Sequence, residues 1–303
     1  MRKKKGFTLV ELLVVIAIIA LLMGILMPAL ARVRQLAQRM VCGSNLSGIG
    51  KAMLIYANDY EDELPKAGGR NTTWGATANW AALDRFQAFG LAQDGTGGTA
   101  SISANFYLLV KYAEVTPKSF ICKGDAGAQP FKLSNYPTAG IDENINAWDF
   151  GPTADAREQC SYSYHNPFGL YVLTTASEPG MAVAADRNPW IATPSTDPRP
   201  DFALFKPDIQ PWNGTTEEAK LGNAQTHQDD GQNVLFMDSH VEFEKRAYCG
   251  VEDDNVYTYV QNTSIPQQMG DMPMAGQSSP GHRKDSLLVH DGEISGASAP
   301  TRR

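Results

Sequence analysis

Patterns that mark catalytic or metal-binding chains are missing from this sequence of 303 residues. It has no H-E-x-x-H, no EF-hand calcium loop, no G-x-S-x-G and no G-x-x-x-x-G-K-[ST]. It has no C-x-x-C, and none of its five histidines stands at the usual zinc-ligand spacing. The sequence therefore does not indicate an enzyme, and we predict no catalytic residues.

Cysteine is scarce, and the four that occur, Cys42, Cys122, Cys160 and Cys249, stand far apart. In an exported domain such cysteines form up to two disulfides, with three ways to pair. We favour Cys42–Cys122 and Cys160–Cys249. The alternative is that one or more stay free and buried.

Positive charge is in the minority, with 26 Lys and Arg against 33 Asp and Glu and a net charge of −7. Removal of residues 1–6 takes away four basic residues and leaves −11. This balance argues against nucleic acid as a partner. A hydrophobic content of 43% is enough for the core of one sizeable head domain.

One long apolar run dominates the beginning of the chain, from Phe7 to Ala31, with Glu11 as its only charge. Its composition favours a helix, and its length is sufficient to cross a bilayer. A carboxylate at the bilayer centre costs about 3 kcal/mol on insertion scales, so we expect Glu11 to have a partner. The basic residues before the run place the N-terminus in the cytoplasm and the head outside the inner membrane.

The order of residues before this run separates it from an ordinary signal peptide, whose small-residue cleavage site follows the apolar core. Here Gly6 precedes the core and is followed by Phe7, Thr8, Leu9 and Glu11. This order resembles the leader of type IV prepilins. The resemblance implies that a prepilin peptidase cuts after Gly6 and methylates Phe7, while the helix stays on the protein. The alternative is a plain signal anchor.

The same resemblance assigns an assembly role to the helix. In the family, the carboxylate at the position of Glu11 pairs with the terminal amine of a neighbouring subunit and helps to set the register of packed helices. Pro28 removes one helical hydrogen-bond donor and clashes with the carbonyl of Gly24, so we expect a kink or melted segment between them.

Apolar residues recur at spacings of three and four beyond Pro28, which predicts one amphipathic helix from Phe7 to about Asn58. We divide the chain into a leader (1–6), a transmembrane and assembly half-helix (7–31), an amphipathic half-helix (32–60), a globular head (61–250) and a flexible tail (251–303). The fold class is α+β and pilin-like, with the helix packed on an antiparallel sheet and large loop insertions.

The head shows a second resemblance, to large prepilin-like chains of the Planctomycetes. The matching elements are a Cys-x-x-Asn-Leu segment, a Phe-x-Cys-x-x-Asp segment, an apolar strand ending in Asp, and a β-hairpin similar to the family's H-X9-DG region. They contain Cys42, Cys122, Asp186, His227, Asp238 and His240. Ser239 replaces the usual Gly of the hairpin, and ten residues instead of nine separate His227 from Asp238.

Four of these polar residues are candidates for a metal site: Asp186, His227, Asp238 and His240. The carboxylate oxygens of the two Asp residues suit calcium, and some secretion pseudopilins bind calcium near the C-terminus. The alternative is that the Asp residues only form turns. No other cofactor is expected.

These patterns together indicate a structural subunit of a type II secretion pseudopilus or a type IV pilus-like filament. The implied partners are prepilin peptidase, like subunits or other pseudopilins, the inner-membrane assembly platform and the membrane. The head would lie in the periplasm or at the cell surface. Two alternatives stay open: a membrane-anchored binding module, for example for glycans, and an anchored enzyme that uses His227, Asp238 and His240.

Overall fold

The computed structural model describes residues 7–192, 214–260, 270–274 and 276–292. The α-helices are α1 (Leu9–Asp59), α2 (Arg85–Phe89), α3 (Ile102–Tyr112), α4 (Thr153–Ala156) and α5 (Thr216–Leu221). Short 3-10 turns are η1 (Pro117–Phe120), η2 (Leu133–Asn135), η3 (Asn144–Asn146), η5 (Gln225–His227) and η6 (Val251–Asp253). The strands are β1 (Thr73–Trp74), β2 (Thr99–Ala100), β3 (Tyr162–His165), β4 (Ala182–Asp186), β5 (Gln232–Phe236), β6 (Val241–Glu244) and β7 (Leu288–Val289).

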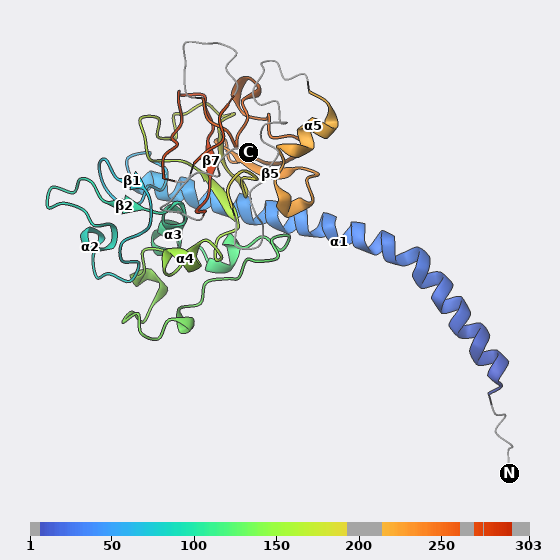
Figure 1. The fold of residues 1–303 in the computed structure, drawn as a ribbon. Helices are drawn as coiled ribbons and strands as arrows, with labels where there is room; N and C mark the ends of the chain where they lie inside the picture. Colours follow the sequence, from blue (N-terminus) through green and yellow to red (C-terminus); the bar gives the residue numbers. More distant parts are fainter. Residues whose placement is uncertain (1–6, 193–213, 261–269, 275, 293–303) are drawn as a thin grey trace, which may run out of the picture.

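Helix α1 is a single element of 51 residues that extends far beyond the head (Figure 1). It begins with a capping box, in which Thr8 N donates to the Glu11 carboxylate (2.8 Å) and Glu11 N donates to Thr8 Oγ1 (3.3 Å). It ends where Glu61 and Asp62 adopt positive φ angles, and the N–H of Asp62 donates back to the carbonyl of Ala57 (3.0 Å). The long helix predicted from the apolar spacing is confirmed.

The expected melted segment between Gly24 and Pro28 is absent, because α1 continues through Pro28 without interruption. Proline removes only one N–H, and the helical hydrogen bonds on either side keep the segment helical. The part of α1 outside the head curves on its way to the N-terminus (Figure 1). A Cβ at Gly24 would meet no other atom within 4 Å, so this position faces open space.

The apolar stripe of α1 contacts the head over a shorter length than the spacing suggested. Its buried residues begin at Cys42 and continue through Leu46, Ile49 and Met53. Before Cys42 the stripe is open to solvent, with Val33 60%, Leu36 55% and Met40 76% exposed. The exposed apolar part of α1 therefore reaches about ten residues beyond the boundary that we expected at residue 31.

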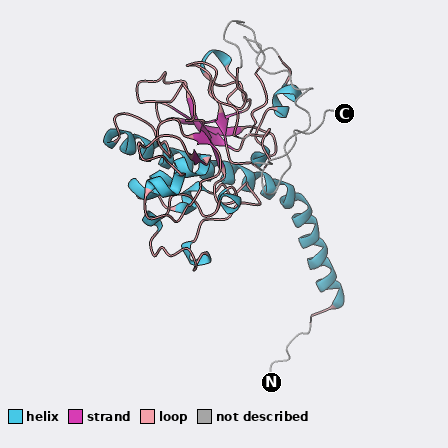
Figure 2. Cartoon of the chain, turned by 60° about the vertical axis from the view of Figure 1, so that its left-hand side comes forward, coloured by secondary structure: helices cyan, strands magenta, loops and turns pink. Residues whose placement is uncertain are grey.

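The head contains an antiparallel five-stranded sheet in the order β6-β5-β4-β3-β7. Figure 2 shows strands, in magenta, at the centre of the head. β5 and β6 form the predicted hairpin, with Asn233 opposite Phe243 and Leu235 opposite Val241. β4 aligns Ala185 with Val234 of β5 and Tyr162 of β3 with Asp186. The predicted combination of a long helix and an antiparallel sheet is confirmed.

The head half of α1 lies against β5 and β6 at very short range. A Cβ at Gly50 would come within 2.6 Å of the Leu235 side chain, so any larger residue here would force that side chain to shift. At Gly43 a Cβ would lie 3.0 Å from the side-chain oxygen of Asn233. Gly43 and Gly50 are thus places where the helix contacts the sheet, whereas a Cβ at Gly48 would meet no atom within 4 Å.

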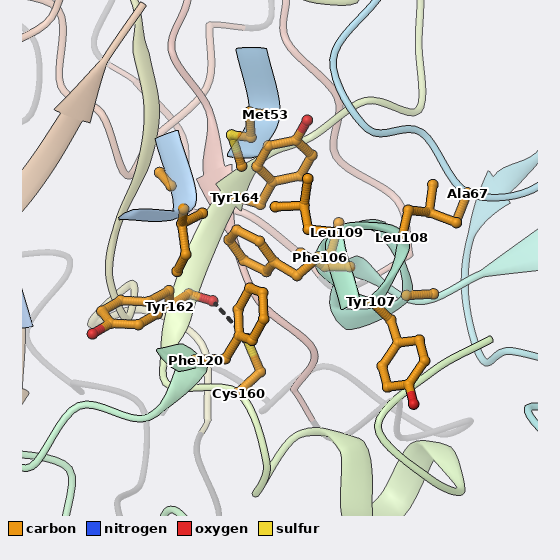
Figure 3. Close-up of a cluster of buried hydrophobic side chains, with 14 of the residues drawn as sticks. Met53, Ala67, Phe106, Tyr107, Leu108, Leu109, Phe120, Cys160, Tyr162 and Tyr164 are labelled. Atoms are coloured by element: carbon orange, nitrogen blue, oxygen red, sulfur yellow. Dashed lines mark hydrogen bonds between the residues drawn. The ribbon is translucent and has the colours of Figure 1, made fainter. Parts of the chain in front are cut away.

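The main core lies between α1, α3 and β3 and is rich in aromatic side chains (Figure 3). Phe106 of α3 packs on Phe120 and on Tyr164 of β3, with ring centroids 5.5 and 5.1 Å apart. Tyr107 faces the other side of α3 and contacts Phe150 at 4.9 Å. Helix α3 is buried on nearly all sides, so it lies inside the core of the head.

The C-terminal part of the chain is folded into the head, contrary to the flexible tail that we expected for 251–303. β7 pairs with β3 at the edge of the sheet, with Val289 opposite Tyr164. The carboxylate of Asp291 accepts hydrogen bonds from the backbone N–H groups of Ile102 (2.8 Å) and Ser103 (2.7 Å) at the start of α3. We had predicted a flexible tail because this segment contains few apolar residues. Strand pairing and helix capping hold it in place. Residues 261–269, 275 and 293–303 lie outside the described part.

A second buried carboxylate, Asp149, lies near Asp291 and makes the stability of the head depend on pH. Burial and, second, the Asp291 charge raise the pKa of Asp149 from 3.8 to about 7. Between these values the folded chain holds a proton that the unfolded chain has lost, so this group's contribution to stability falls as pH rises. As the pH rises from 4 to 8, the free energy of unfolding of Asp149→Asn should therefore increase, relative to that of the unmodified chain, by up to about 4 kcal/mol.

Urea unfolding of both chains in detergent at pH 4.5 and pH 8 measures this difference. The matched control is Asp142→Asn, because Asp142 is exposed. A difference between Asp149→Asn and the unmodified chain that is equal at both pH values would contradict the assignment.

Candidate functional site

The most extensive candidate surface is the apolar face of α1 outside the head. An 18-residue window of this helix has a mean hydropathy of 3.1, and none of it is buried. By length and composition it is able to cross a membrane. Phe7 (72% exposed) begins this surface and Met40 (76% exposed) ends it. An apolar surface of this size requires lipid or other protein around it.

Glu11 is held at the first turn of α1. Its carboxylate accepts hydrogen bonds from the backbone N–H (2.8 Å) and the hydroxyl (2.7 Å) of Thr8. Phe7 directly precedes this cap. The carboxylate therefore lies close to the backbone nitrogen of Phe7, which the predicted cleavage after Gly6 would convert into an N-terminal amine. Gly6, the predicted cleavage residue, lies outside the described residues, and Gly24 and Pro28 lie on the exposed part of α1.

A second candidate is a buried cluster of four side chains that the sequence analysis had selected from separate motifs. Cys42 of α1 and Cys122, just after η1, form a disulfide with their Cα atoms 5.2 Å apart. Asp186 ends β4 and His227 ends η5. All four are buried, and their sulfur, nitrogen and oxygen atoms lie within 4.8 Å of one another. The fold thus gathers residues up to 185 positions apart.

The imidazole of His227 connects the disulfide with the carboxylate. Its Nε2 lies 3.7 Å from Cys122 Sγ and 3.2 Å from Asp186 Oδ2. Asn233 holds the carboxylate in place, because its backbone N–H (2.7 Å) and its side-chain amide (3.1 Å) both donate to Asp186 Oδ2. Sequence reasoning missed Asn233, whose position opposite the end of β4 becomes visible only from the strand register.

Two polar contacts fix the loops around the cluster. Arg187, next to Asp186, forms a buried ion pair with Asp125 (2.8 Å), which ties the segment after Cys122 to the end of β4. Arg39 of α1 forms an ion pair with Asp230 and lies 4.6 Å above the ring of Phe243. Through these contacts α1, the β5–β6 hairpin and the loop after η5 are held together beside the cluster.

Asp238 and His240 do not join this cluster. They lie in the exposed turn between β5 and β6, where the backbone N–H of His240 donates to Asp238 (3.2 Å) and Ser239 has a φ of +72°. The hydrogen bond from the His240 side chain lowers the pKa of Asp238. His227 and Asp238 lie beyond opposite ends of β5, which is roughly 16 Å long. The proposed four-residue metal site and the enzyme site built on His227, Asp238 and His240 are therefore wrong.

Calcium does not fit either part of this divided set. Each pair offers one carboxylate and one imidazole, whereas Ca²⁺ takes six to eight oxygen ligands. Within the described ranges, the disulfide cluster is the sole group of three or more metal-binding side chains.

The expected Cys42–Cys122 disulfide is present. The expected Cys160–Cys249 disulfide is not, because both of these residues are free thiols. Cys160 precedes β3 and donates to the carbonyl of Tyr162 (3.8 Å), whereas Cys249 follows β6 and donates to the carbonyl of Ala247 (3.7 Å). Burial raises the pKa of the Cys160 thiol to about 12, which keeps it protonated. Both behave as small packing residues.

A cleft of about 470 Å³ opens at the head end of α1, and the sequence analysis did not predict it. Tyr56 and Tyr60 stack with their ring centroids 4.1 Å apart, and Tyr112 lies 5.6 Å from Tyr60. Charged side chains of both signs complete its lining, namely Asp59, Glu61, Glu63, Lys66, Arg70 and Arg85. The i, i+4 spacing of Tyr56 and Tyr60 at the end of an amphipathic helix was the available signal.

Comparison with known proteins identifies a family motif at the beginning of α1. Residues 1–27 match the family described as the prokaryotic N-terminal methylation motif. The type IV wide pilus major component PilA4 of Thermus thermophilus is 36% identical over 110 residues, which cover 36% of this chain and 74% of that protein. The chain belongs to the type IV pilin family. The larger part of this pilin-family chain lies outside that alignment, and no solved structure matches it.

Proposed function

We propose that this chain is a filament subunit of a type IV pilus or a type II secretion pseudopilus, cut after Gly6 and N-methylated at Phe7 by prepilin peptidase. The supporting observation is the unburied apolar face of α1 from Phe7 to Met40. Side chains of α1 are buried only from Cys42 onward. Gln35, Gln38 and Arg39 already make polar contacts with the head, but the apolar side chains from Phe7 to Met40 remain available to lipid or to neighbouring helices.

Electrostatics supplies the direction of assembly in this proposal. Lipid tails are as apolar as a neighbouring helix, so transfer from bilayer to filament gains little from the hydrophobic effect. The carboxylate of Glu11 is the exception, because a charge in the bilayer is unfavourable by about 3 kcal/mol. A neighbour's Phe7 amine would offset this penalty and fix the stagger between adjacent helices. Thr8 holds the carboxylate until that amine arrives.

The proposal places the basic residues 2–5 in the cytoplasm and the head outside the inner membrane. The partners are then prepilin peptidase, an inner-membrane assembly platform and like subunits or other pseudopilins. Structural proteins of this kind catalyse no reaction, so the chain is the substrate of an enzyme rather than an enzyme itself.

Mass spectrometry of the mature N-terminus from native membranes tests the proposal. We expect a peptide that begins at methylated Phe7, and its loss in Gly6→Ala. Leu83→Ala, at a 90% exposed position on the head, is the matched control and should be processed normally. A native peptide that begins at Met1 would show a plain anchor and overturn the assignment, as would cleavage after Ala31.

A binding role for the head is the second candidate, and the tyrosine cleft favours it. Its volume of about 470 Å³ falls in the range of small-ligand sites. Tyr60 and Tyr112, 39% and 45% exposed, offer apolar ring faces beside charged hydrogen-bonding groups. This combination suits a neutral oligosaccharide, whose ring faces stack on aromatics and whose hydroxyls bind the charges.

Binding of the detergent-solubilised chain to an array of neutral oligosaccharides tests this role. Tyr60→Ala should abolish binding, and Leu170→Ala, at another 90% exposed position, should retain it. Absence of binding by the unmodified chain would remove the second candidate and leave the filament role untouched.

A further inference from the structure

The disulfide cluster contains the side chains that hold zinc in proteins. Reduced Cys42 and Cys122 would offer two thiolates, His227 an imidazole nitrogen and Asp186 a carboxylate. Zinc binds four such ligands as a tetrahedron with bonds of about 2.0–2.3 Å, which places the ligand atoms about 3.3–3.8 Å apart. The four groups here already lie within 4.8 Å of one another, so the cluster is close to that size.

The orientation of the donors also fits a central cation. Nε2 of His227 faces both Cys122 Sγ and Asp186 Oδ2, at 3.7 and 3.2 Å, from its place inside the head. The other carboxylate oxygen, Asp186 Oδ1, is fully buried and has no hydrogen-bond partner in the described part of the chain. An unpaired buried oxygen of this kind costs about 1–3 kcal/mol, and a metal ion would supply the missing interaction.

The surroundings hold the ligands as supporting groups do in metal sites. Asn233 donates twice to Asp186 Oδ2 and thereby orients the carboxylate. Gly124 permits the close approach of the imidazole, because a Cβ there would come within 3.2 Å of His227 Nδ1. The Cα atoms of Cys42 and Cys122 are 5.2 Å apart, so rotation about their Cα–Cβ bonds is enough to separate the sulfurs to about 3.8 Å.

We propose that the reduced chain binds one Zn²⁺ through Cys42, Cys122, Asp186 and His227, and that zinc and the disulfide are alternative states of one cross-link. A dithiol reductant delivers two electrons and two protons to the S–S bond and becomes a disulfide itself. Zn²⁺ then displaces the two thiol protons, and two Zn–S bonds replace the S–S bond. In either state α1 stays fastened to the segment after η1.

Cobalt(II) titration of the full chain in detergent, after reduction by a phosphine, tests the site. We expect one equivalent to bind with a thiolate-to-cobalt charge-transfer band and the d–d absorption of a tetrahedral complex, and one equivalent of Zn²⁺ to displace it. The oxidised chain should show neither band. Asn233→Ala should weaken binding about tenfold, as supporting residues of metal sites do, and His227→Gln should weaken it further.

Cys160→Ser is the matched control, because it removes a buried thiol outside the cluster and should bind cobalt normally. Circular dichroism establishes whether each reduced variant is folded. A folded reduced chain without stoichiometric binding would overturn the proposal. A reduced chain that unfolds and does not refold with zinc would also overturn it, as would equal cobalt affinity in His227→Gln, Asp186→Asn and the unmodified chain.

Discussion

Glu11→Gln is expected to reduce filament assembly about 100-fold while leaving cleavage and membrane insertion intact. The substitution keeps a side-chain oxygen that accepts the hydrogen bonds from Thr8, so the cap of α1 is retained. It removes only the charge, and with it the attraction to a neighbour's N-terminal amine. An interaction of about 3 kcal/mol corresponds to this change in the equilibrium.

The measurement is the ratio of sheared filaments to membrane-bound subunits, together with the mass of the mature N-terminus. Glu11→Ala, which removes both cap and charge, should assemble no better than Glu11→Gln. Glu61→Ala is the control, because it removes an exposed carboxylate from the head end of the helix. Normal assembly by Glu11→Gln would show that the cap alone matters and that no charge pair sets the stagger.

Loss of the Cys42–Cys122 disulfide is expected to lower the free energy of unfolding by about 4 kcal/mol. The bond closes a loop with a sequence separation of 80 residues, and this length sets the entropy that it removes from the unfolded chain. For a chain of this size the melting temperature should fall by roughly 10 °C. Cys42→Ser and Cys122→Ser should behave alike, because each breaks the same bond.

Urea unfolding of the oxidised variants, followed by tryptophan fluorescence, measures the effect. Cys160→Ser should change the free energy by less than about 1 kcal/mol, because it alters a buried thiol by one atom and breaks no bond. Zinc should restore part of the loss in the reduced chain with both cysteines present and none in Cys42→Ser. Equal stability of Cys42→Ser and the unmodified oxidised chain would contradict the prediction.

Strong local patterns are what the sequence revealed well. The helix follows from a run of apolar residues with one carboxylate, and the β5–β6 hairpin follows from alternation around Asp238 and Ser239. Both are decided by residues close together in the chain, where steric and hydrophobic preferences act directly. The family resemblance rested on this same local order around Gly6 and Glu11.

Features that depend on distant residues were missed. Periodicity shows which face of α1 is apolar, but the point where the head begins to cover it depends on how β5 approaches Gly50. β7 has only two residues and pairs with a strand more than 120 positions earlier. The sequence suggested pairing Cys160 with Cys249 only because four cysteines make two pairs. A disulfide requires two Cβ atoms that lie close together and point toward each other, and positions along the chain do not show this.

The edge position of β7 has a consequence for the way the subunit is made. Residues of α3 leave the ribosome early, yet the carboxylate that caps this helix belongs to Asp291, close to the end of the chain. Until that segment has been synthesised, the N–H groups of Ile102 and Ser103 and the outer edge of β3 lack the partners that they have in the folded head. A head truncated before β7 would therefore expose an unpaired strand edge and an uncapped helix, and unpaired strand edges are the places where chains aggregate.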